Sequence, residues 1–391
     1  MISREEILDK VHQYEEEAIS LRRYFHQIPE LGMKEYKTSQ AICRYLTAYG
    51  IRPIPLDPTG VTAYIGPEEG RVIALRADID ALQIPEETGA EYASCHPGYM
   101  HACGHDGHIA GLLLAARILK ELEGKLTVRV KLIFQPSEEN TLGAKHVISR
   151  GILEDVHAIF GLHLFSDLPC GLINVEPGPR MAQTDRFSIT FEGRGGHAGK
   201  PHLCVDATLM AAEYIMSAQS IVSRQINPIE SAVVTIGSLH SGTQYNIISQ
   251  KAELAGTCRS FSEETARQLR SGLERRAYAI ADCYGGRAVI DYDYGSHPPV
   301  INHEEYSRQI RTCMEGLLPQ ADYSHTDPLM LGEDFSWYQQ SVPGVFAFVG
   351  CGKADGSSYP NHHPGFEIEE KALSYAGILH LAAVMAMEQN Q

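Results

Sequence analysis

Residues 100–111, MHACGHDGHIAG, hold the densest group of metal-ligating side chains in the chain. Cys103, His105 and His108 fall within six positions, and Asp106 stands between the two histidines. Thiolate, imidazole and carboxylate groups together bind borderline-soft divalent metals. The same residues could instead form a nucleophilic pair, with Cys103 attacking and His105 acting as its base. A free cysteine packed at a helix start is a third interpretation, and this segment alone does not choose among the three.

Four other segments place ligand-type residues at or near the ends of predicted strands. These residues are Asp78 and Asp80 after a strand at 72–77, Glu138 and Glu139 after a strand at 126–134, His163 within a strand at 158–164, and His362 and His363 in the loop after GVFAFVG. Open α/β sheets place ligand sites outside the carboxyl ends of their strands, so all five segments can meet at one edge. Taken singly, each has an ordinary structural explanation. Taken together, they predict a metal site with acid/base groups beside it.

Helices and strands alternate along the first part of the chain, which favours an α/β domain. Ser3 and Glu6 form a capping box before a helix that should end near Pro29, and a second helix is expected from Thr38 to Gly50. A strand at 61–65 precedes the strand ends described above. The last part of the chain returns to the same class, with a helix from Asn302, a strand GVFAFVG and a final helix from about residue 368.

The pattern changes after residue 182. Strand, helix, strand, strand, helix and strand are expected in that order, at 186–192, 204–224, 232–240, 251–260, 263–284 and 287–294. Ser262 and Gly285 should cap the second of these helices. The order β-α-β-β-α-β is that of a ferredoxin-like unit. We therefore predict a domain at 183–295 inserted between two parts of a catalytic domain, 1–182 and 296–391.

Composition narrows the class of protein further. The chain has 391 residues, 43% of them apolar and 21% charged, which fits a globular protein of two domains. Its net charge of −16 argues against nucleic acid or an anionic membrane as a partner. No apolar run is long enough to span a bilayer, and the polar N-terminus lacks a signal-peptide core, so a cytoplasmic location is expected. The nine cysteines are scattered and predict no disulfide framework.

Motifs along nearly the whole chain resemble the metallopeptidase family that contains the aminoacylases and glutamate carboxypeptidases. They include ALRADIDALQIPEETG, MHACGHDGH, FQPSEEN, GRGGHAGKPH, GEDFSWY and NHHPGF in family order, and MHACGHDGH followed by FQPxEE is very specific. Within the family, the chain is most similar to the N-acyl-L-amino acid amidohydrolases and hippurate hydrolases. The resemblance implies a zinc-peptidase-like α/β catalytic domain, with a mixed central sheet flanked by helices, and an inserted ferredoxin-like lid or dimerisation domain.

The resemblance also implies a role for single residues. The implied metal ligands are Cys103, His105, Glu139, His163 and His362. Cys103 would be a thiolate between two metals, Glu138 the general base, and Asp80 a residue that orients a ligand. His197, in GGHAG, would polarise the scissile carbonyl from a neighbouring subunit. Asn246 and Arg259 would contact the substrate carboxylate.

The implied reaction is the metal-dependent hydrolysis of N-acyl amino acids, above all N-acetyl amino acids, by a homodimer or larger homo-oligomer. Each subunit would hold two divalent ions, with zinc, manganese, cobalt and nickel all possible. A dipeptidase on the same two-metal site is the alternative enzyme. A metal-storing protein is the non-enzymatic alternative, and Glu138 counts against it because storage needs no base. The chain departs from the family pattern at Gln83, Cys204, Ala207, Ile247, Ile248, Ser249 and Gly365, which leaves the preferred acyl group and amino acid open.

Overall fold

The computed structural model describes residues 2–388, which form two compact units. Unit 1 consists of Met1–Gly178, Ile301–Asp327 and Asp334–Gln391, and unit 2 of Pro179–Val300 and Pro328–Glu333. Each unit has its own cluster of buried apolar side chains. Within residues 2–388, no helix is both long and apolar enough to cross a membrane, and all nine cysteines are free.

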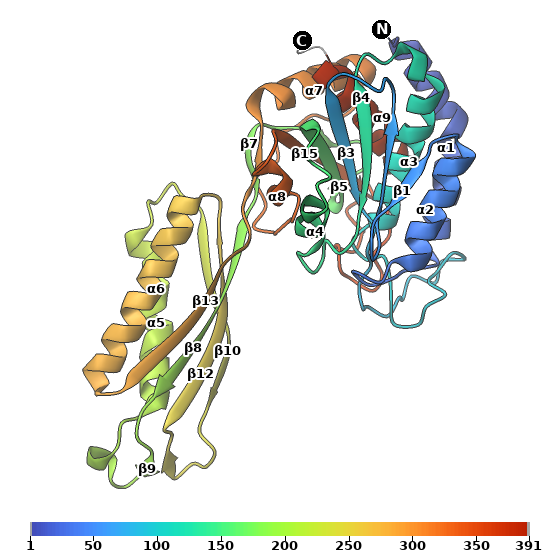
Figure 1. Ribbon diagram of the computed structural model, residues 1–391. Helices are drawn as coiled ribbons and strands as arrows, with labels where there is room; N and C mark the ends of the chain where they lie inside the picture. The colour runs from blue at the N-terminus through green and yellow to red at the C-terminus, as the bar shows by residue number, and fades with distance from the viewer. Residues whose placement is uncertain (1, 389–391) are drawn as a thin grey trace. The chain divides into compact units, whose positions relative to one another are not determined.

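A seven-stranded mixed sheet forms the centre of unit 1 (Figure 1). Its strands follow the order β1 (Pro53–Pro55), β2 (Val61–Ile65), β4 (Arg129–Gln135), β3 (Val72–Asp78), β5 (Val156–Pro169), β15 (Gly344–Gly352) and β6 (Ile173–Asn174). The four strands β4, β3, β5 and β15 are parallel, whereas the outer pairs are antiparallel. Side chains on both faces of the parallel strands are buried, which explains the apolar runs VIAL in β3 and GVFAFVG in β15. The expected mixed central sheet is confirmed.

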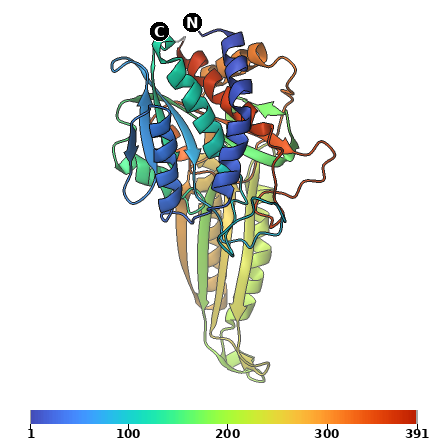
Figure 2. The ribbon, with the colours of Figure 1, turned by 90° about the vertical axis from the view of Figure 1, so that its right-hand side faces the viewer.

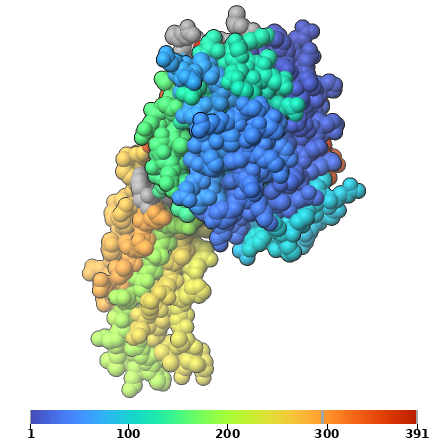
Figure 3. Space-filling model, turned by 45° about the vertical axis from the view of Figure 1, so that its right-hand side comes forward, coloured from blue at the N-terminus to red at the C-terminus, as the bar shows by residue number. Residues whose placement is uncertain are grey.

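Helices cover this sheet. The helices of unit 1 are α1 (Arg4–His26), α2 (Tyr36–Ala48), α3 (His105–Glu121), α4 (Gly143–Ser149), α7 (Glu304–Leu317), α8 (Ser336–Gln339) and α9 (Ala372–Glu388), with a 3₁₀ turn at Glu123–Lys125. α3 and α9 pack against β3 and β5, and α1 packs over both helices, a layer that faces the viewer in Figure 2. The predicted capping box of Ser3 and Glu6 is present at the start of α1. In Figure 3 the N-terminal segments, in blue, cover much of the visible face of unit 1.

Unit 2 contains a four-stranded antiparallel sheet in the order β10 (Ala232–Ser241), β12 (Lys251–Ser260), β8 (Gln183–Glu192) and β13 (Arg287–His297). α5 (Ala207–Gln225) and α6 (Glu263–Tyr284) pack against each other and against this sheet (Figure 1). The Ser262 side chain accepts the N–H of Thr265, and Gly285 has a left-handed φ of 70°, so both predicted caps of α6 are confirmed.

The structure differs from the expected elements mainly where elements are short. The structure adds several short elements to those predicted from sequence: β1, β6, β7 (Gly178–Met181), β9 (Gly196–His197), β11 (Ile247–Ile248), β14 (Val300–Asn302), α8 and 3₁₀ turns at Glu123–Lys125 and Pro201–Leu203. Runs of two to four residues are too short to show a period. The helix predicted over roughly 204–224 is present as α5, which begins at Ala207 because the Asp206 side chain caps its first turn.

Candidate metal centre

The residues predicted at strand ends meet at one edge of the unit 1 sheet. Asp78 ends β3 opposite Gln135, the last residue of β4, and His163 in β5 lies opposite Phe348 in β15. Because these strands are parallel, the segments that follow them leave the sheet at the same edge. α3 adds its N-terminus there, and His105 is its first residue.

The five implied metal ligands lie close together at this edge. Sγ of Cys103 is 3.3 Å from Nε2 of His163 and 3.2 Å from Nε2 of His362. Oε1 of Glu139 is 3.3 Å from the same His362 nitrogen and 3.9 Å from Nε2 of His105. The His362 side chain is 53% exposed while the other four are largely buried, so the cluster opens to solvent on the His362 side.

Hydrogen bonds fix the orientation of the two buried imidazoles. Nδ1 of His163 lies 2.9 Å from the carbonyl oxygen of Leu164, and Nδ1 of His105 lies 2.9 Å from that of Asp80. A carbonyl can only accept, so each Nδ1 carries a ring proton, which leaves Nε2 as the nitrogen available to a metal. Both Nε2 atoms face the cluster, which is the arrangement that metal-binding histidines use.

His108 has a different function from the histidines around it. Its Nδ1 donates to Oδ1 of Asp78 at 2.5 Å, and its Nε2 accepts the N–H of Leu164 at 2.9 Å. Both ring nitrogens are therefore committed, and no lone pair remains for a metal. His108 instead joins the end of β3 to β5 beneath the cluster.

Glu138 and Asp80 lie beside the ligands. A carboxylate oxygen of Glu138 lies within 4.8 Å of ligand atoms on His105 and Glu139, and Glu138 is 8% exposed. Oδ2 of Asp80 accepts the backbone N–H of Glu139 at 3.1 Å, and Oδ1 lies 3.3 Å from Nδ1 of His105. Asp80 therefore orients His105 through its backbone carbonyl and holds the backbone of Glu139 through its side chain.

The donor set fits a cation. Among residues 2–388, the buried atoms without a hydrogen-bond partner include Nε2 of His105 and Oε1 of Glu139, both aimed into the cluster. Burial by itself would lower the pKa of His105, but the carboxylates of Asp78, Asp80 and Glu139 raise it to about 10. Burial and the nearby carboxylates also raise the pKa of the Cys103 thiol well above its usual range. The nearby carboxylates contribute to both pKa shifts, and a divalent metal would neutralise their negative charge.

A buried network that the sequence analysis did not anticipate supports the ends of β3 and β4. Nη1 of Arg76 donates to Asp78 at 2.7 Å, Nη2 donates to Asp334 at 3.1 Å, and Nε donates to Gln135 at 2.9 Å. Asp334 also accepts the N–H of Ala144, the second residue of α4, at 2.9 Å. An arginine inside the apolar run VIALRAD was the signal in the sequence, because a buried guanidinium needs anionic partners.

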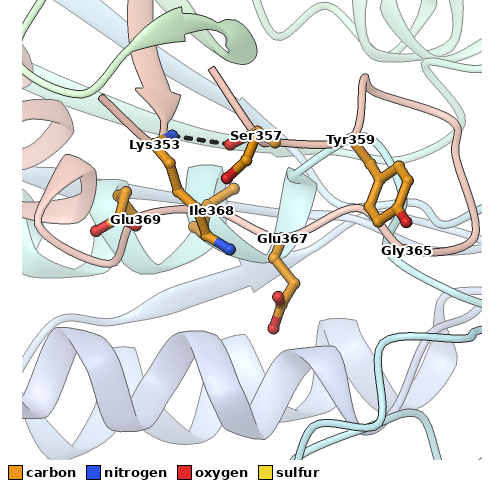
Figure 4. Close-up of a pocket in the computed structure, with 8 residues that line it drawn as sticks. Lys353, Ser357, Tyr359, Gly365, Glu367, Ile368 and Glu369 are labelled. Atoms are coloured by element: carbon orange, nitrogen blue, oxygen red, sulfur yellow. Dashed lines mark hydrogen bonds between the residues drawn. The ribbon is translucent and has the colours of Figure 1, made fainter. Parts of the chain in front are cut away.

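The loop that carries His362 is held from both sides. The Asn361 side chain donates to the carbonyls of Cys103 and Leu164, at 3.2 and 3.1 Å. His363 stacks instead on Tyr359, with ring centroids 4.1 Å apart, so only His362 of the two neighbours reaches the cluster. A cavity of about 230 Å³ lies under this loop, and none of the implied ligands lines it (Figure 4).

Unit 2 holds the remaining implied site residues at its surface. His197 lies on β9, which pairs with β11, and Asn246 directly precedes β11, so the two exposed residues are neighbours. Nδ1 of His197 accepts the N–H of Gly199 at 3.0 Å. The ring proton is therefore on Nε2, where it can be donated to a ligand.

Arg259 lies at the other end of the unit 2 sheet. In the pairing of β12 with β8, Lys251 is opposite Glu192 at the end nearest β9, whereas Arg259 is opposite Thr184. The nine residues from Lys251 to Arg259, which make eight residue-to-residue steps, span about 27 Å of extended strand. A single copy of unit 2 therefore does not bring Arg259 together with His197 and its neighbour.

Sequence comparisons with known proteins support a metal centre of a hydrolytic enzyme. Residues 74–385 match the family model Peptidase family M20/M25/M40. An N-acetyl-L-cysteine deacetylase of Bacillus subtilis strain 168 is 40% identical over 383 residues, covering 96% of this chain and 90% of that protein. An IAA-amino acid hydrolase of Arabidopsis thaliana is 38% identical over 367 residues, covering 93% of this chain and 83% of that protein.

Solved structures give the same result. The Bacillus subtilis YXEP protein, described as a dinuclear metal binding peptidase of the M20 family, matches with a TM-score of 0.85 at 35% identity. The match covers 96% of this chain and 98% of that structure. Because the family model spans most of the sequence and the relatives nearly all of it, the chain belongs to peptidase family M20/M25/M40, as a metal-dependent amidohydrolase.

Proposed function

We propose that this chain hydrolyses the amide bond of N-acyl amino acids, above all N-acetyl amino acids, releasing a carboxylic acid and a free amino acid. The observation that carries the proposal is the cluster in which Cys103, three histidine Nε2 atoms and Glu139 face one another, with Glu138 beside them. The names of the relatives, an N-acetyl-L-cysteine deacetylase and an IAA-amino acid hydrolase, support this class of substrate.

Two divalent ions, each zinc, manganese, cobalt or nickel, would be held by this cluster. Two groups of candidate ligands share Cys103, one with His105 and His163 and the other with Glu139 and His362. Cys103 would therefore be a ligand common to both groups. When bound, a metal pair polarises an amide carbonyl and lowers the pKa of a water molecule.

Glu138 would be the general base. Its carboxylate would take a proton from the attacking water and deliver it to the nitrogen of the leaving amino acid, since an amine leaves poorly without a proton. Glu139 cannot share this task while its oxygens bind metal. Two adjacent glutamates suit the two roles because their side chains leave the backbone in different directions.

Unit 2 would act as a ferredoxin-like lid and dimerisation domain. His197 would donate its Nε2 proton to the oxygen of the scissile carbonyl as negative charge develops there. Asn246 and Arg259 would bind the substrate carboxylate. An amino acid is far shorter than the distance between the two ends of the unit 2 sheet, so an active site that uses both His197 and Arg259 must draw them from two subunits.

The experiment is a hydrolysis screen with metal-free protein to which zinc, manganese, cobalt or nickel is returned. N-acetyl amino acids should be turned over faster than the corresponding dipeptides, and elemental analysis of the active protein should find two metals per chain. Faster turnover of dipeptides would favour the dipeptidase alternative. Full activity with at most one metal per chain would contradict the paired centre, and activity that survives chelation would favour Cys103 as a nucleophile.

A further inference from the structure

The turn that carries Glu138 and Glu139 is tight and has an unusual backbone. Ser137 and Thr141 have positive φ angles of 57° and 58°, which side chains other than glycine adopt rarely. The carbonyl oxygen of Ser137 accepts the N–H of Gly143 at 3.0 Å, and that of Glu138 accepts the N–H of Thr141 at 2.7 Å. Such a backbone persists only where the surroundings hold it in place.

Two buried carboxylates hold this turn on either side of Glu138. Oε1 of Glu35 accepts the backbone N–H of Ser137 at 2.8 Å. Oδ2 of Asp80 accepts the backbone N–H of Glu139 at 3.1 Å. The backbone N–H groups of both residues adjacent to Glu138 are therefore held by carboxyl oxygens from segments distant in the sequence.

Glu35 is itself held in place for this contact. It is fully buried, and its second oxygen, Oε2, accepts the hydroxyl of Thr59 at 2.6 Å. Although Glu35 is the N-cap residue of α2, its side chain makes no capping bond and extends to the turn instead. Gly32 also packs closely against the turn, because a Cβ at this position would lie 2.5 Å from Oγ of Ser137.

We propose that Glu35 is a positioning residue, whose carboxylate acts with Asp80 to fix the turn around Glu138 and so the direction in which Glu138 faces the substrate. The proposal rests on the proposed function of Glu138 as general base. Glu35 is outside the set of implied ligands and reaches the site only through the backbone of Ser137. Its effect should therefore fall on the chemical step and not on substrate binding.

Three variants test this proposal. Glu35→Leu removes the acceptors with little change in volume, whereas Glu35→Gln keeps an amide oxygen for Ser137 and can donate to Thr59. Burial and the Asp80 carboxylate raise the pKa of Glu35 to about 7, so a neutral glutamine is a close replacement. Glu30→Leu is the matched control, because the Glu30 carboxylate also accepts one backbone N–H and one threonine hydroxyl, both from Thr38 and neither from the turn.

In Glu35→Leu, kcat should fall roughly 10- to 100-fold, as for other residues that orient a metal or catalytic group. KM for an N-acetyl amino acid should change much less. Hydrogen exchange of the peptide that covers residues 135–143 should become faster, in both metal-free and metal-loaded protein. Glu35→Gln should retain most of the turnover and protection, and Glu30→Leu should retain both.

The proposal is overturned if folded Glu35→Leu keeps normal exchange or normal kcat, or if Glu30→Leu causes equal losses. Should Glu35→Leu fail to fold, Thr59→Val decides the question, because it removes only the partner of Oε2. Smaller losses of kcat and of protection are expected in that variant, and their absence also overturns the proposal. Hydrogen exchange separates the two claims: a Glu138→Gln protein with normal turnover would refute the general base, while exchange still reports whether Glu35 fixes the turn.

Discussion

The buried histidines of the unit 1 cluster and His197 of unit 2 differ in exposure and in the hydrogen bond that Nδ1 makes. His105 and His163 are buried, and each has Nδ1 bound to a backbone carbonyl so that Nε2 points into the cluster. His197 is exposed on a two-residue strand, and its Nδ1 accepts the N–H of Gly199. A metal centre needs several ligands at fixed distances before the metal arrives, whereas a donor to the substrate has to act only after binding.

The two units also differ in whether their implied active-site residues lie together. Every implied ligand and the implied base are present within unit 1, at one sheet edge. The implied substrate contacts of unit 2 lie at opposite ends of its sheet, with Lys251 and Arg259 marking those ends. All the candidate metal ligands are therefore within one unit of one chain, whereas the proposed site that uses His197 and Arg259 together would need a second chain. Changes in unit 1 should act within one chain, and changes in unit 2 should depend on assembly.

The largest expected effect is that of Glu138→Gln. Turnover should fall about 10²- to 10⁴-fold, as for other general bases, while both metals are retained. Glu139→Gln is the paired variant and should lose metal as well as activity, since it removes a ligand. Steady-state kinetics with elemental analysis on both variants checks this, and a metal-replete Glu138→Gln protein with near-normal kcat would exclude Glu138 as the base.

His197→Ala should reduce kcat by about 10²- to 10³-fold, the usual loss of a donor to a developing oxyanion. Mixed with Glu138→Gln subunits, it should recover part of the activity, because a hybrid dimer contains one site with both residues intact. The measurement is the rate after subunit exchange has been verified. No recovery would mean that His197 acts on the metal centre of its own chain. One chain would then supply the complete active site.

Arg259→Ala should remove a preference for substrates with a free carboxylate. A guanidinium binds a carboxylate with two parallel hydrogen bonds. Converting an N-acetyl amino acid to its C-terminal amide should therefore cost about 2 kcal/mol or more in the unmodified enzyme, roughly 30-fold in kcat/KM. In Arg259→Ala the acid and the amide should become similar substrates. A full preference for the acid in that variant would assign the carboxylate to another residue.

The sequence predicted the residues of the metal centre better than the buried residues that hold them in place. The five segments were recognisable because ligand-type residues follow buried strands, and parallel strands bring such ends together whatever the loops between them do. Arg76 and Asp334 were not recognised as partners, since 258 positions separate them and no local pattern links them. Glu35 was missed for the same reason, because its partner Ser137 lies 102 positions away in the sequence.

In unit 2 the long elements could be predicted from the sequence, and the shortest strands could not. Its six main elements follow the predicted order because each is long enough to show a period and several have recognisable caps. The strands β9 and β11 have two residues each and could not be read from periodicity, although they are what places His197 next to Asn246. The roles implied for residues of unit 2 stay predictions, since they concern an assembly of chains.

The smallest expected effect concerns a buried histidine that lacks the features of those in the metal centre. His380 in α9 is fully buried against Phe160, and in the part of the chain that the structure describes neither of its ring nitrogens has a hydrogen-bond partner. Burial lowers its pKa to about 3, so the ring is neutral in the folded protein. We expect His380→Leu to stabilise the fold by about 1–2 kcal/mol at pH 7.5, because an unpartnered polar group no longer has to be buried.

The advantage of His380→Leu should grow as the pH falls. In the unfolded chain this histidine takes up a proton below pH 6.5, whereas in the folded chain it does so only near pH 3. Between these values the unfolded state binds more protons, so the unmodified protein loses stability on acidification, by up to ~1.4 kcal/mol per pH unit. Thermal unfolding at pH 7.5 and 5.5 measures this, with kcat unchanged. An equal gain at both pH values would show that packing and not protonation limits stability at this position.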